Sequence, residues 1–454
     1  MFNKVNLINF KSFSNLSFDF TQKNNKSPKN LIAIYGENGS GKTNIVDAFK
    51  ILKLSTLTTR FADDYTIFQS MTSKETAESD DLPPSIENVQ KMVRAVRYRE
   101  LKPVLRNSPR IGTDEITKLE FHFTIQNVNG SYVLEYDKDC KLVAESLYYL
   151  INKRRGTLFS INKADEKIKV DLNKNTFLLS SQRKELEELN SKLWGKHTFI
   201  SIFNQYQDNV NKEFIDKRVS KHFFDVLEEF NKLIIWDDEI KGPFVDNDSL
   251  LANMESGTIN REQAPQLKKS EDVIFNYFSS LYADIKDVHY KIKEEGNEIY
   301  YQLYIHKNVS GQLVEVPFYL ESNGTKNLLS LLTAFFWVTK GHTIIIDEID
   351  SGIHDILMNQ IIKDISYNLK GQLLFTTHDT FLLHELPTSS IYFINVDILG
   401  YKRILSANDF DKKISSNNNV QKMYLDGDFN GVPDPLDIDF EELFEPFNES
   451  ELED

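Results

Sequence analysis

The first fifty-odd residues alternate apolar and polar positions in a way that predicts β-strands. VNLINF (5–10) and LSFDF (16–20) place most apolar side chains on one face, as in a half-buried strand. LIAIY (31–35) is wholly apolar and predicts a buried strand, whereas NIVDAFKILKL (44–54) has the apolar spacing of an amphipathic helix. The pattern predicts a strand, a loop and a helix around residue 40.

Three further segments between residues 116 and 150 predict an antiparallel meander that continues the N-terminal sheet. They are KLEFHFTIQ (118–126), SYVLEYD (131–137) and KLVAESLYYL (141–150). The dipeptide Asn129-Gly130 is expected to form the turn of the first hairpin, because asparagine and glycine suit the left-handed positions of a tight turn. The polar stretch ESDDLPPS (78–85) predicts a surface loop or linker.

Residues 151–297 change to a helical pattern, most clearly in LSSQRKELEELNSKL (179–193) and SKHFFDVLEEFNKLIIW (220–236). Sustained heptads are missing, so the pattern indicates a helical insertion and not a long coiled-coil arm. Strands return after residue 298 in EIYYQLYIH (298–306) and VEVPFYL (314–320). No run of eighteen apolar residues predicts a membrane span.

Charge is distributed unevenly along the chain. The formal net charge is −15, but residues 434–454 alone carry ten carboxylates and no Lys or Arg, which leaves −5 for the rest. A mildly acidic body neither supports nor excludes a DNA partner. The single cysteine, Cys140, rules out a disulfide framework and fits a reducing compartment, so we expect a cytoplasmic protein.

The loop between the predicted strand and helix reads GENGSGKT (36–43) and predicts a phosphate site. Glycines let backbone N–H groups converge on an anion, and the N-terminus of the following helix adds positive potential. A second apolar strand, TIIIDE (343–348), ends in two acids. The first acid can hold Mg2+ and the second can orient a water molecule. Either motif alone is common, but the two in this order predict a P-loop ATPase.

A segment before the acid pair, ESNGTKNLLSLLTAFFWV (321–338), predicts an apolar helix whose start presents hydroxyl and amide groups. On its own this start indicates an ordinary helix cap. It gains meaning from its order along the chain: it precedes DEIDSGIH (347–354), which in turn precedes TTHD (376–379).

Together with NFKSFSNLSFDF (9–20) and YLDGDFNGVPD (424–434), these motifs make the chain resemble the compact ABC-type ATPases related to SMC and OLD heads. Such AAA-class ATPases occur in bacterial anti-phage systems of the PARIS, Septu, retron and abortive-infection types. The resemblance covers about residues 1–150 and 298–432. It implies an α/β fold, an ABC-type head in which a mixed sheet carrying the P-loop joins an antiparallel β subdomain, with a helical insertion. We expect an N-terminal lobe (1–150), the insertion (151–297), a C-terminal lobe (298–433) and an acidic tail (434–454).

The resemblance also implies roles for individual residues toward ATP and Mg2+. Asp347 and Thr43 would hold the metal, Glu348 would position or deprotonate water, and His378 would sense the γ-phosphate. The alternative for His378 is a surface turn residue, but the preceding strand and the order of the motifs favour the functional role. The remaining P-loop residues would surround the phosphates: Gly36, Glu37, Asn38, Gly39, Ser40, Gly41 and Lys42.

In that family the site is shared between two subunits, so the resemblance implies a head-to-tail homodimer or higher homo-oligomer around ATP. The signature residues Ser322, Asn323, Gly324 and Thr325 would contact nucleotide held by the partner. Asp350 and Ser351 would lie at the same seam. Loss of the γ-phosphate would then loosen the dimer.

The expected function is that of a scaffold and sensor in an anti-phage system, holding a separately encoded nuclease or toxin until a phage-derived trigger arrives. The helical insertion argues against a transporter subunit, and the short tail leaves no room for a fused Toprim nuclease. The alternative is an SMC-like DNA-repair or chromosome-associated ATPase, whose basic strip would include Lys153, Arg154, Arg155, Lys163 and Lys167. A third possibility is an assembly hub with slow hydrolysis.

The acidic tail also contains apolar residues, which leaves its role open between docking and disorder. The DGD (426–428) and DID (437–439) patterns resemble metal carboxylates, but isolated acids in an acidic stretch are usually solvated. The apolar positions are Leu436, Ile438, Phe440, Leu443, Phe444 and Phe447.

Overall fold

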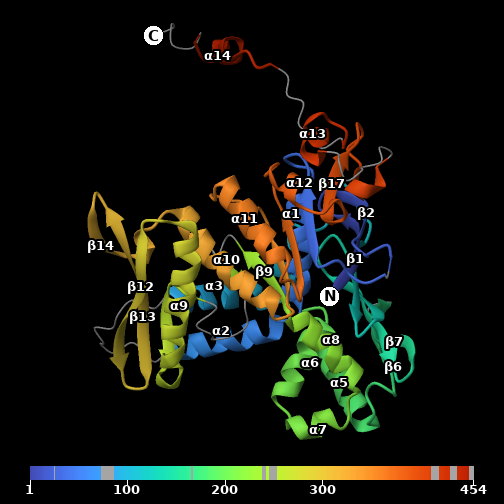
Figure 1. The fold of residues 1–454 in the computed structure, drawn as a ribbon. Helices are drawn as coiled ribbons and strands as arrows, with labels where there is room; N and C mark the ends of the chain where they lie inside the picture. Colours follow the sequence, from blue (N-terminus) through green and yellow to red (C-terminus); the bar gives the residue numbers. More distant parts are fainter. Residues whose placement is uncertain are drawn as a thin grey trace, which may run out of the picture.

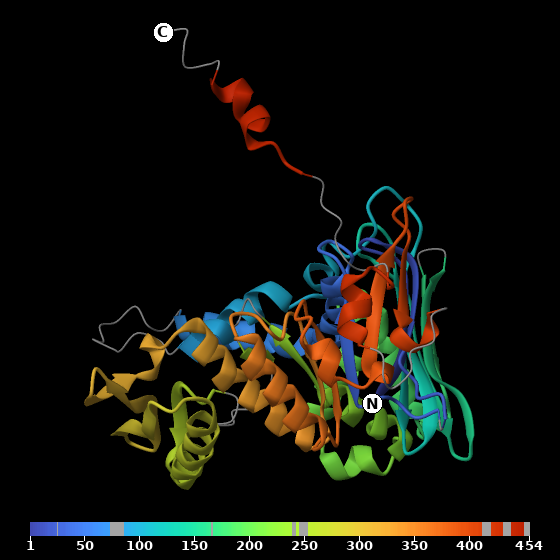
Figure 2. The same ribbon diagram turned by 45° about the horizontal axis from the view of Figure 1, so that its top comes forward.

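The computed structural model describes residues 1–24, 26–72, 86–164, 167–237, 242–244, 253–410, 419–429 and 437–448. Figures 1 and 2 show three sheets side by side with helices packed around and between them. Among the helices of these ranges, none is both long and apolar enough to cross a membrane. The predicted linker at residues 78–85 lies outside the described residues.

A seven-stranded mixed sheet forms the centre of the molecule. Its inner strands β9 (Leu233–Asp237), β15 (Thr343–Ile346), β16 (Gln372–Thr376), β3 (Leu31–Tyr35) and β17 (Ile391–Val396) run parallel in that spatial order. The edge strands β10 (Gly242–Phe244) and β18 (Lys402–Ser406) pair antiparallel with β9 and β17. All five residues of β3 are buried, as expected for an apolar run in a covered parallel sheet.

A second seven-stranded sheet is antiparallel throughout. Its order is β2 (Phe13–Asp19), β1 (Phe2–Phe10), β4 (Thr117–Ile125), β5 (Val128–Tyr136), β6 (Leu142–Ile151), β7 (Arg154–Ala164) and β8 (Lys167–Leu172). The prediction that the meander continues the N-terminal sheet is confirmed, because β4 pairs directly with β1. With this antiparallel sheet beside the mixed one, the predicted α/β fold class is also confirmed.

The turn of the β4–β5 hairpin was wrongly placed by the Asn-Gly signal. Ile125 pairs with Val128, so the two turn residues are Gln126 and Asn127, which both adopt left-handed conformations with φ of 50° and 62°. Gly130 lies inside β5 instead. A Cβ at this position would meet the Phe123 ring at 2.5 Å, so the glycine makes room for an aromatic side chain on the next strand.

A smaller sheet forms the left lobe of Figure 1. In it β13 (Glu298–Val309) pairs with β12 (Ile285–Glu295) on one side, and with β11 (Ser256–Asn260) and β14 (Gln312–Pro317) on the other. Helix α9 (Ala264–Leu281) packs on its inner face. The chain leaves β14 through a short 3-10 turn (Phe318–Leu320) and enters helix α10 (Asn323–Thr339).

The remaining helices follow the three sheets. Eight helices precede β9 along the chain: α1 (Lys42–Ser55), α2 (Thr58–Thr72), α3 (Ile86–Tyr98), α4 (Leu101–Leu105), α5 (Ser180–Leu193), α6 (Phe199–Asp208), α7 (Lys212–Asp216) and α8 (Lys221–Asn231), counted over the described residues. The C-terminal part contains α11 (Asp355–Ser366), α12 (Leu382–Glu385), α13 (Val420–Leu425) and α14 (Phe440–Asn448).

Two hydrophobic cores meet at the central sheet. Along β3, Ile32 and Ile34 belong to the core shared with the antiparallel sheet, whereas Leu31, Ala33 and Tyr35 belong to the core under α10 and α11. This alternation follows from the two-residue period of a strand. The central sheet is therefore covered on both faces, which fixes the position of the loops at the ends of its strands.

The expected helical insertion, residues 151–297, contains strands as well as helices. Within residues 151–297, β7 and β8 extend the antiparallel sheet, and β9 joins the central sheet beside β15. The segment LIIW was read as the end of a helix, but α8 ends at Asn231 and the next residues form β9. A short apolar run suits either element, and burial between two strands decided for the strand.

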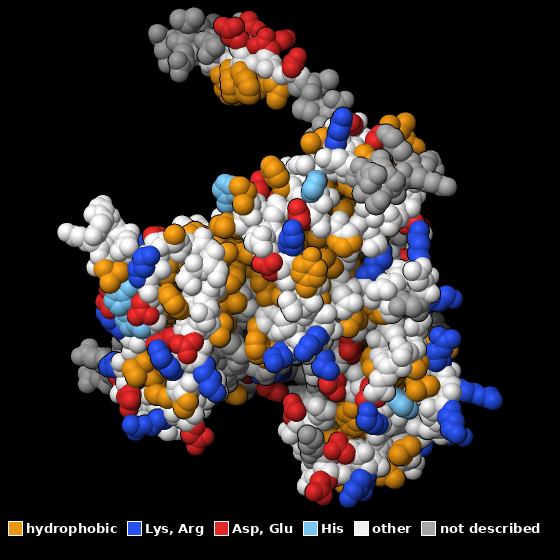
Figure 3. Space-filling model, viewed as in Figure 1, with side chains coloured by type: hydrophobic (Ala, Val, Ile, Leu, Met, Phe, Trp, Pro, Cys, Tyr) orange, Lys and Arg blue, Asp and Glu red, His pale blue; other side chains and the backbone are white. Residues whose placement is uncertain are grey.

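The acidic tail contains the one helix that lies apart from the body in Figures 1 and 2, α14. Its apolar side chains Phe440, Leu443, Phe444 and Phe447 are exposed and lie on one face of the helix, as Figure 3 shows. The docking role of the tail therefore stays a prediction. Of the two acidic patterns, DGD and DID, neither belongs to a metal-binding cluster among the described residues.

Candidate functional site

The glycine-rich loop (36–41) connects the central strand β3 to α1, at the carboxyl ends of the parallel strands. Gly39 and Gly41 have φ of 77° and 109°, a left-handed conformation that favours glycine. A Cβ on Gly41 would also lie 2.7 Å from the Phe13 ring of β2. Helix α1 begins at Lys42 without a side-chain cap, so its first N–H groups remain available to an anion.

Lys42 lies buried at this helix start and points back along the loop. Its Nζ donates hydrogen bonds to the backbone oxygens of Gly36, at 2.8 Å, and Glu37, at 3.1 Å. Burial lowers the pKa of Lys42, and the nearby carboxylates of Asp347, Glu348 and Asp350 act in the opposite direction. Within the described residues Lys42 forms no ion pair, so a buried cation faces the loop without a direct counter-charge.

Other P-loop residues surround this position with polar groups. The Ser40 hydroxyl is buried without a hydrogen-bond partner among the described residues, whereas Thr43 is exposed on the first turn of α1. Glu37 is half-buried and Asn38 is exposed at the tip of the loop.

The predicted acid pair follows β15, next to the loop. Thr376, at the end of the adjacent strand β16, donates its hydroxyl to Asp347 Oδ1 and accepts a 2.8 Å hydrogen bond from the Glu348 backbone N–H. Glu348 has φ of 47°, a left-handed conformation that costs a non-glycine residue about 1 kcal/mol. The neighbouring strand thus orients both acids, and the Glu348 side chain extends into solvent.

His378 follows β16 and is brought to the same place. Burial and the positive charge of Lys42 lower its pKa, while the carboxylates of Asp350, Glu348 and Asp347 oppose the shift. These influences place the imidazole in one electrostatic neighbourhood with the lysine and the acids. The lowered pKa favours the neutral imidazole, and the His378 side chain is exposed.

The signature residues form the N-terminus of α10, with Ser322 as its cap. The Ser322 hydroxyl accepts a hydrogen bond from the Thr325 N–H at 3.2 Å. A Cβ on Gly324 would lie 2.2 Å from the backbone oxygen of Gly352, so the helix start touches the loop after the acid pair. Ser322 and Asn323 are exposed.

Asp350 and Ser351 lie on that same loop. Asn327 of α10 donates a 2.8 Å hydrogen bond to the Ser351 backbone oxygen. Asp350 Oδ1 is buried and lacks a partner among the described residues. No hydrogen bond of the described chain joins residues 322–325 to residues 36–43.

Sequence reasoning missed two residues near the loop. Lys402 of β18 donates hydrogen bonds to the Gly39 backbone oxygen, at 2.6 Å, and to Ser12, at 2.9 Å. Asp379 is buried beside His378, and burial raises the pKa of its carboxyl to about 6. Lys402 could not be found from the sequence, because β18 reaches the loop only through strand pairing. Asp379 is the last residue of TTHD (376–379), but that pattern assigns it no role.

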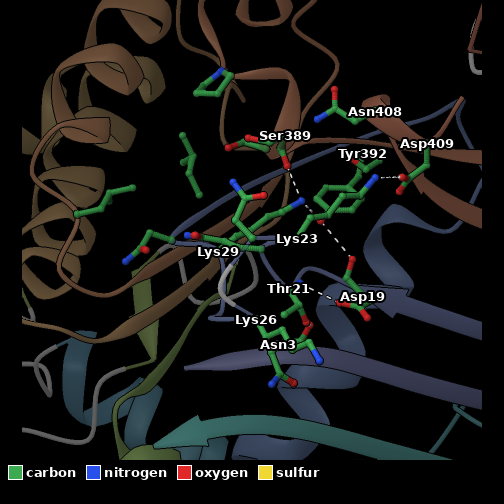
Figure 4. A pocket seen from close by; sticks show the side chains of 18 of the residues that line it. Asn3, Asp19, Thr21, Lys23, Lys26, Lys29, Ser389, Tyr392, Asn408 and Asp409 are labelled. Carbon is green, nitrogen blue, oxygen red and sulfur yellow. Dashed lines mark hydrogen bonds and ion pairs between the residues drawn. The ribbon is translucent and has the colours of Figure 1, made fainter. Parts of the chain in front are cut away.

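A cavity of about 1120 Å³ lies elsewhere in the described part of the chain. It is lined by residues at the amino ends of β3 and β17, on the opposite edge of the central sheet from the P-loop, and Figure 4 shows Lys29 at its centre. Lys29 donates hydrogen bonds to the Ser389 backbone oxygen and the Tyr392 hydroxyl. Lys29 thus already has hydrogen-bond partners within the protein, so the P-loop remains the candidate site.

The basic residues expected to form a DNA-binding strip are divided between two places. Lys153, Arg154 and Arg155 are exposed at the β6–β7 turn, whereas Lys163 and Lys167 are exposed at the opposite end of β7. The length of β7 separates the two groups by roughly 30 Å. The five residues therefore do not form one local patch.

The residues around the loop fit a nucleotide triphosphate with Mg2+. Three observations support the fit: an uncapped helix start, a buried lysine without a carboxylate partner, and buried oxygen atoms of Ser40, Asp350 and Asp379 that lack hydrogen bonds within the described chain. Buried polar atoms normally have partners, so these groups are suited to a ligand. Carboxylate and hydroxyl oxygens are the ligands that Mg2+ prefers.

Comparison with known families gives one match, which spans residues 31–384. Its description reads "AAA domain, putative AbiEii toxin, Type IV TA system". No curated protein matches the chain.

Solved structures with some similarity include three heads of SMC proteins. One is an SMC head bound to the C-terminal winged-helix domain of ScpA, with 14% identity, a TM-score of 0.46, and coverage of 89% of this chain and 97% of that one. The SMC head domain from Thermotoga maritima has 14% identity and a TM-score of 0.35, and the match covers 89% of this chain and 98% of that one. A third is a head with an extended coiled coil, bound to the C-terminal domain of ScpA derived from Pyrococcus furiosus. It has 16% identity and a TM-score of 0.37, and the match covers 89% of this chain and 96% of that one. With TM-scores below 0.5, these similarities support no inference about function.

Proposed function

Because the chain belongs to the AAA-domain family whose model spans residues 31–384, we propose that it binds ATP with Mg2+ at the P-loop and hydrolyses it. The observation that carries this proposal is the buried Lys42 at the uncapped start of α1. A bound anion would stabilise a buried lysine that has no counter-charge. A triphosphate would also accept hydrogen bonds from the free N–H groups at the helix start.

The residues around the loop would divide the work of binding. Lys42 would turn from the Gly36 and Glu37 carbonyls to the phosphates, and the Thr43 hydroxyl with the Asp347 carboxylate would hold Mg2+. The bound metal would neutralise charge on the phosphates. Thr376 keeps Asp347 oriented for this task, because its hydroxyl already occupies one oxygen of the carboxylate.

Glu348 and His378 would act on the attacking water and the γ-phosphate. The exposed Glu348 carboxylate would accept a proton from water, which is the role of a general base. His378, whose lowered pKa favours the neutral imidazole, would donate one ring N–H to a phosphate oxygen. The strained backbone at Glu348 favours a positioning role, since strain of this kind concentrates at functional sites.

The proposed site is completed by a second copy of the chain. The N-terminus of α10, formed by Ser322, Asn323, Gly324 and Thr325, would reach the nucleotide of the partner through its exposed residues Ser322 and Asn323, with Asp350 and Ser351 beside it. The supporting observation is that no hydrogen bond of the described chain joins residues 322–325 to the P-loop of the same copy, while Ser322 and Asn323 are exposed. ATP would then hold a head-to-tail dimer, and hydrolysis would release it.

We further propose that this ATP-dependent assembly is a scaffold and sensor in an anti-phage system, which holds a separately encoded nuclease or toxin. The family description, which refers to toxin–antitoxin systems, supports this reading. A phage-derived trigger would act by changing the balance between the closed and open dimers.

Mixing two inactive variants tests the shared site. Lys42→Ala removes the lysine of the P-loop, and Asn323→Glu places a carboxylate where the partner's phosphate would lie. The second change suits folding, because acids are favoured in the first turn of a helix. Each variant alone should hydrolyse ATP at least 100-fold more slowly than wild type. In an equal mixture half of the dimers are mixed and each has one intact site, so about a quarter of wild-type activity should return.

The control is Asn276→Glu, the same change at an exposed position of α9. It should keep full activity. An active Asn323→Glu variant, or a mixture that stays inactive although both chains dimerise, contradicts the shared site. Hydrolysis by Lys42→Ala alone would contradict the assignment of the P-loop itself.

A further inference from the structure

Two histidines and an aspartate gather on the outer face of the small sheet, away from the P-loop. Potential ligand atoms of Asp287, His289 and His306 all lie within 4.8 Å of one another. Figure 3 shows the pale-blue side chains over β12 and β13, next to acidic and basic groups. Only His306 lies in a segment singled out from the sequence, as the last residue of the predicted strand EIYYQLYIH (298–306), and that pattern assigns it no chemistry.

Strand register explains the cluster. Asp287 of β12 lies directly opposite His306 of β13, and His306 lies opposite Glu315 of β14. His289 is two residues after Asp287 and therefore projects from the same face. Its ring stacks on the His306 ring with a centroid distance of 4.9 Å.

The opposite face of these strands is fixed in the protein core. Val288 and Tyr290 of β12, and Leu303 and Ile305 of β13, are all buried there. The potential ligands are thus held on paired strands whose backbones cannot move far, a favourable basis for a metal site.

The two imidazoles have nitrogen atoms without partners. Nδ1 of His289 and Nδ1 of His306 are both shielded from solvent and accept or donate no hydrogen bond in the described chain. An unsatisfied buried polar atom costs about 1–3 kcal/mol, so these two atoms need an explanation. His306 Nδ1 lies 3.8 Å from Asp287 Oδ2, too far for a hydrogen bond.

Glu315 orients one of the rings. Its Oε1 lies 3.1 Å from His289 Nε2, and Lys291 neutralises the other carboxylate oxygen. A proton on Nε2 facing this carboxylate leaves Nδ1 with a free lone pair. A carboxylate behind a histidine is the common arrangement around protein-bound zinc.

We propose that Asp287, His289 and His306 bind one Zn2+ ion, with Glu315 positioning His289. Three atoms no more than 4.8 Å apart have a point within about 2.8 Å (4.8 Å divided by √3) of all of them. Zinc lies about 2.0–2.2 Å from nitrogen and oxygen ligands. Side-chain rotations that move each ligand atom by less than about 1 Å therefore complete the site. Two imidazoles select Zn2+ over Mg2+, which prefers oxygen ligands. The ion fastens β12 to β13, next to the strand that leads into the signature helix.

Zinc titration of the full-length protein tests this site. The protein is first treated with EDTA, desalted, and kept free of nucleotide, so that the result does not depend on the P-loop. Competition with a chromophoric chelator should give one Zn2+ per chain with a dissociation constant of about 1 µM or lower. Millimolar Mg2+ should not compete. Co2+ should give the visible absorption of a four-coordinate site, with water as the fourth ligand.

Variants identify the ligands. The double variant His289→Ala/His306→Ala should bind Zn2+ at least 100-fold more weakly, and Glu315→Gln about 10-fold more weakly. The matched control is His222→Ala/His384→Ala, because each of these histidines also lies beside a carboxylate. It should bind as wild type does. Circular dichroism confirms that the variants are folded.

Two outcomes overturn the proposal. One is a wild-type protein that takes up no Zn2+; the other is a control variant that loses as much affinity as the double variant does, which would indicate scattered surface histidines. Neither outcome bears on the ATPase, since activity and nucleotide binding are measured separately with Mg2+ alone.

Discussion

Buried acids in two regions of this protein differ in how completely they are hydrogen-bonded. In the antiparallel lobe, the Glu145 carboxyl accepts from the Tyr132 hydroxyl at 2.9 Å, the Trp194 indole at 2.8 Å and the Phe199 N–H at 2.8 Å. Around the P-loop, Asp350 and Asp379 each keep one buried oxygen without a partner among the described residues.

The difference separates a structural polar group from groups suited to a ligand. Glu145 joins strand β6 to the start of α6 and to Trp194, so its hydrogen bonds hold the lobe together. The acids near Lys42 are only partly hydrogen-bonded by the protein. Their unpartnered oxygen atoms are stabilised only when a ligand binds. Each prediction below perturbs one side of this contrast.

The largest effect is expected at Lys42. Lys42→Ala should weaken ATP binding at least 100-fold, about 2.7 kcal/mol or more, because the only buried cation of the loop disappears. The free energy of unfolding should change by less than about 1 kcal/mol, since a desolvated charge disappears as well. Titration with a fluorescent nucleotide and urea denaturation measure the two quantities. A variant that binds ATP normally contradicts the proposed site.

The next effect concerns pH and Glu145. Burial raises its pKa to about 7 in the folded protein, from 4.5 in the unfolded chain, although three donors favour the ionised form. Its stabilising contribution is complete below pH 4.5 and is lost as the pH rises through 7, a change of about 3 kcal/mol. Urea denaturation from pH 5 to 8 should show this loss in wild type but not in Glu145→Gln. The difference between the two proteins isolates this residue from other titrating groups.

At pH 5, Glu145→Gln should lower the free energy of unfolding by about 2 kcal/mol. The hydroxyl oxygen of the protonated carboxyl can still accept a hydrogen bond, but the amide nitrogen cannot, so one of the three buried donors loses its acceptor. The gap from wild type should narrow toward pH 8, because only wild type loses stability there. Equal stability at pH 5 would mean that the donors rearrange.

The smallest effect on stability is expected for Asp350→Asn. Its buried oxygen has no partner to lose within the described chain, so the unfolding free energy should stay within about 0.5 kcal/mol of wild type. ATP hydrolysis should nevertheless fall several-fold if the residue lies at the dimer seam. Denaturation and a coupled ATPase assay measure both, and a strong loss of stability would remove Asp350 from the functional group.

Local patterns in the sequence predicted much of this architecture. The strand and helix around residue 40 follow from apolar spacing, and the cap at Ser322 follows from a hydroxyl before an apolar helix. The acid pair sits at the end of β15 because an apolar strand must end where carboxylates reach solvent. The structure brings Lys42, Asp347, Glu348 and His378 together, while their catalytic roles stay predictions.

Features that depend on distant segments could not be predicted. The run LIIW became strand β9 only because β15, more than a hundred residues later, pairs with it. Asn129-Gly130 carried a turn signal, yet the register with β4 put the turn three residues earlier. Lys402 and the His289–His306 pair likewise depend on strand pairing, which leaves no local signature.

The contact between Gly324 and Gly352 has a mechanical consequence. With no side chain on either residue, the tip of α10 and the segment behind Glu348 are in backbone contact, and Asn327 fastens them a second time. Ser351 in turn is tied to the Glu348 carbonyl through its N–H, at 2.9 Å. These contacts would therefore transmit a displacement of the helix tip by a neighbouring molecule to Glu348 of the same chain, without a domain rotation.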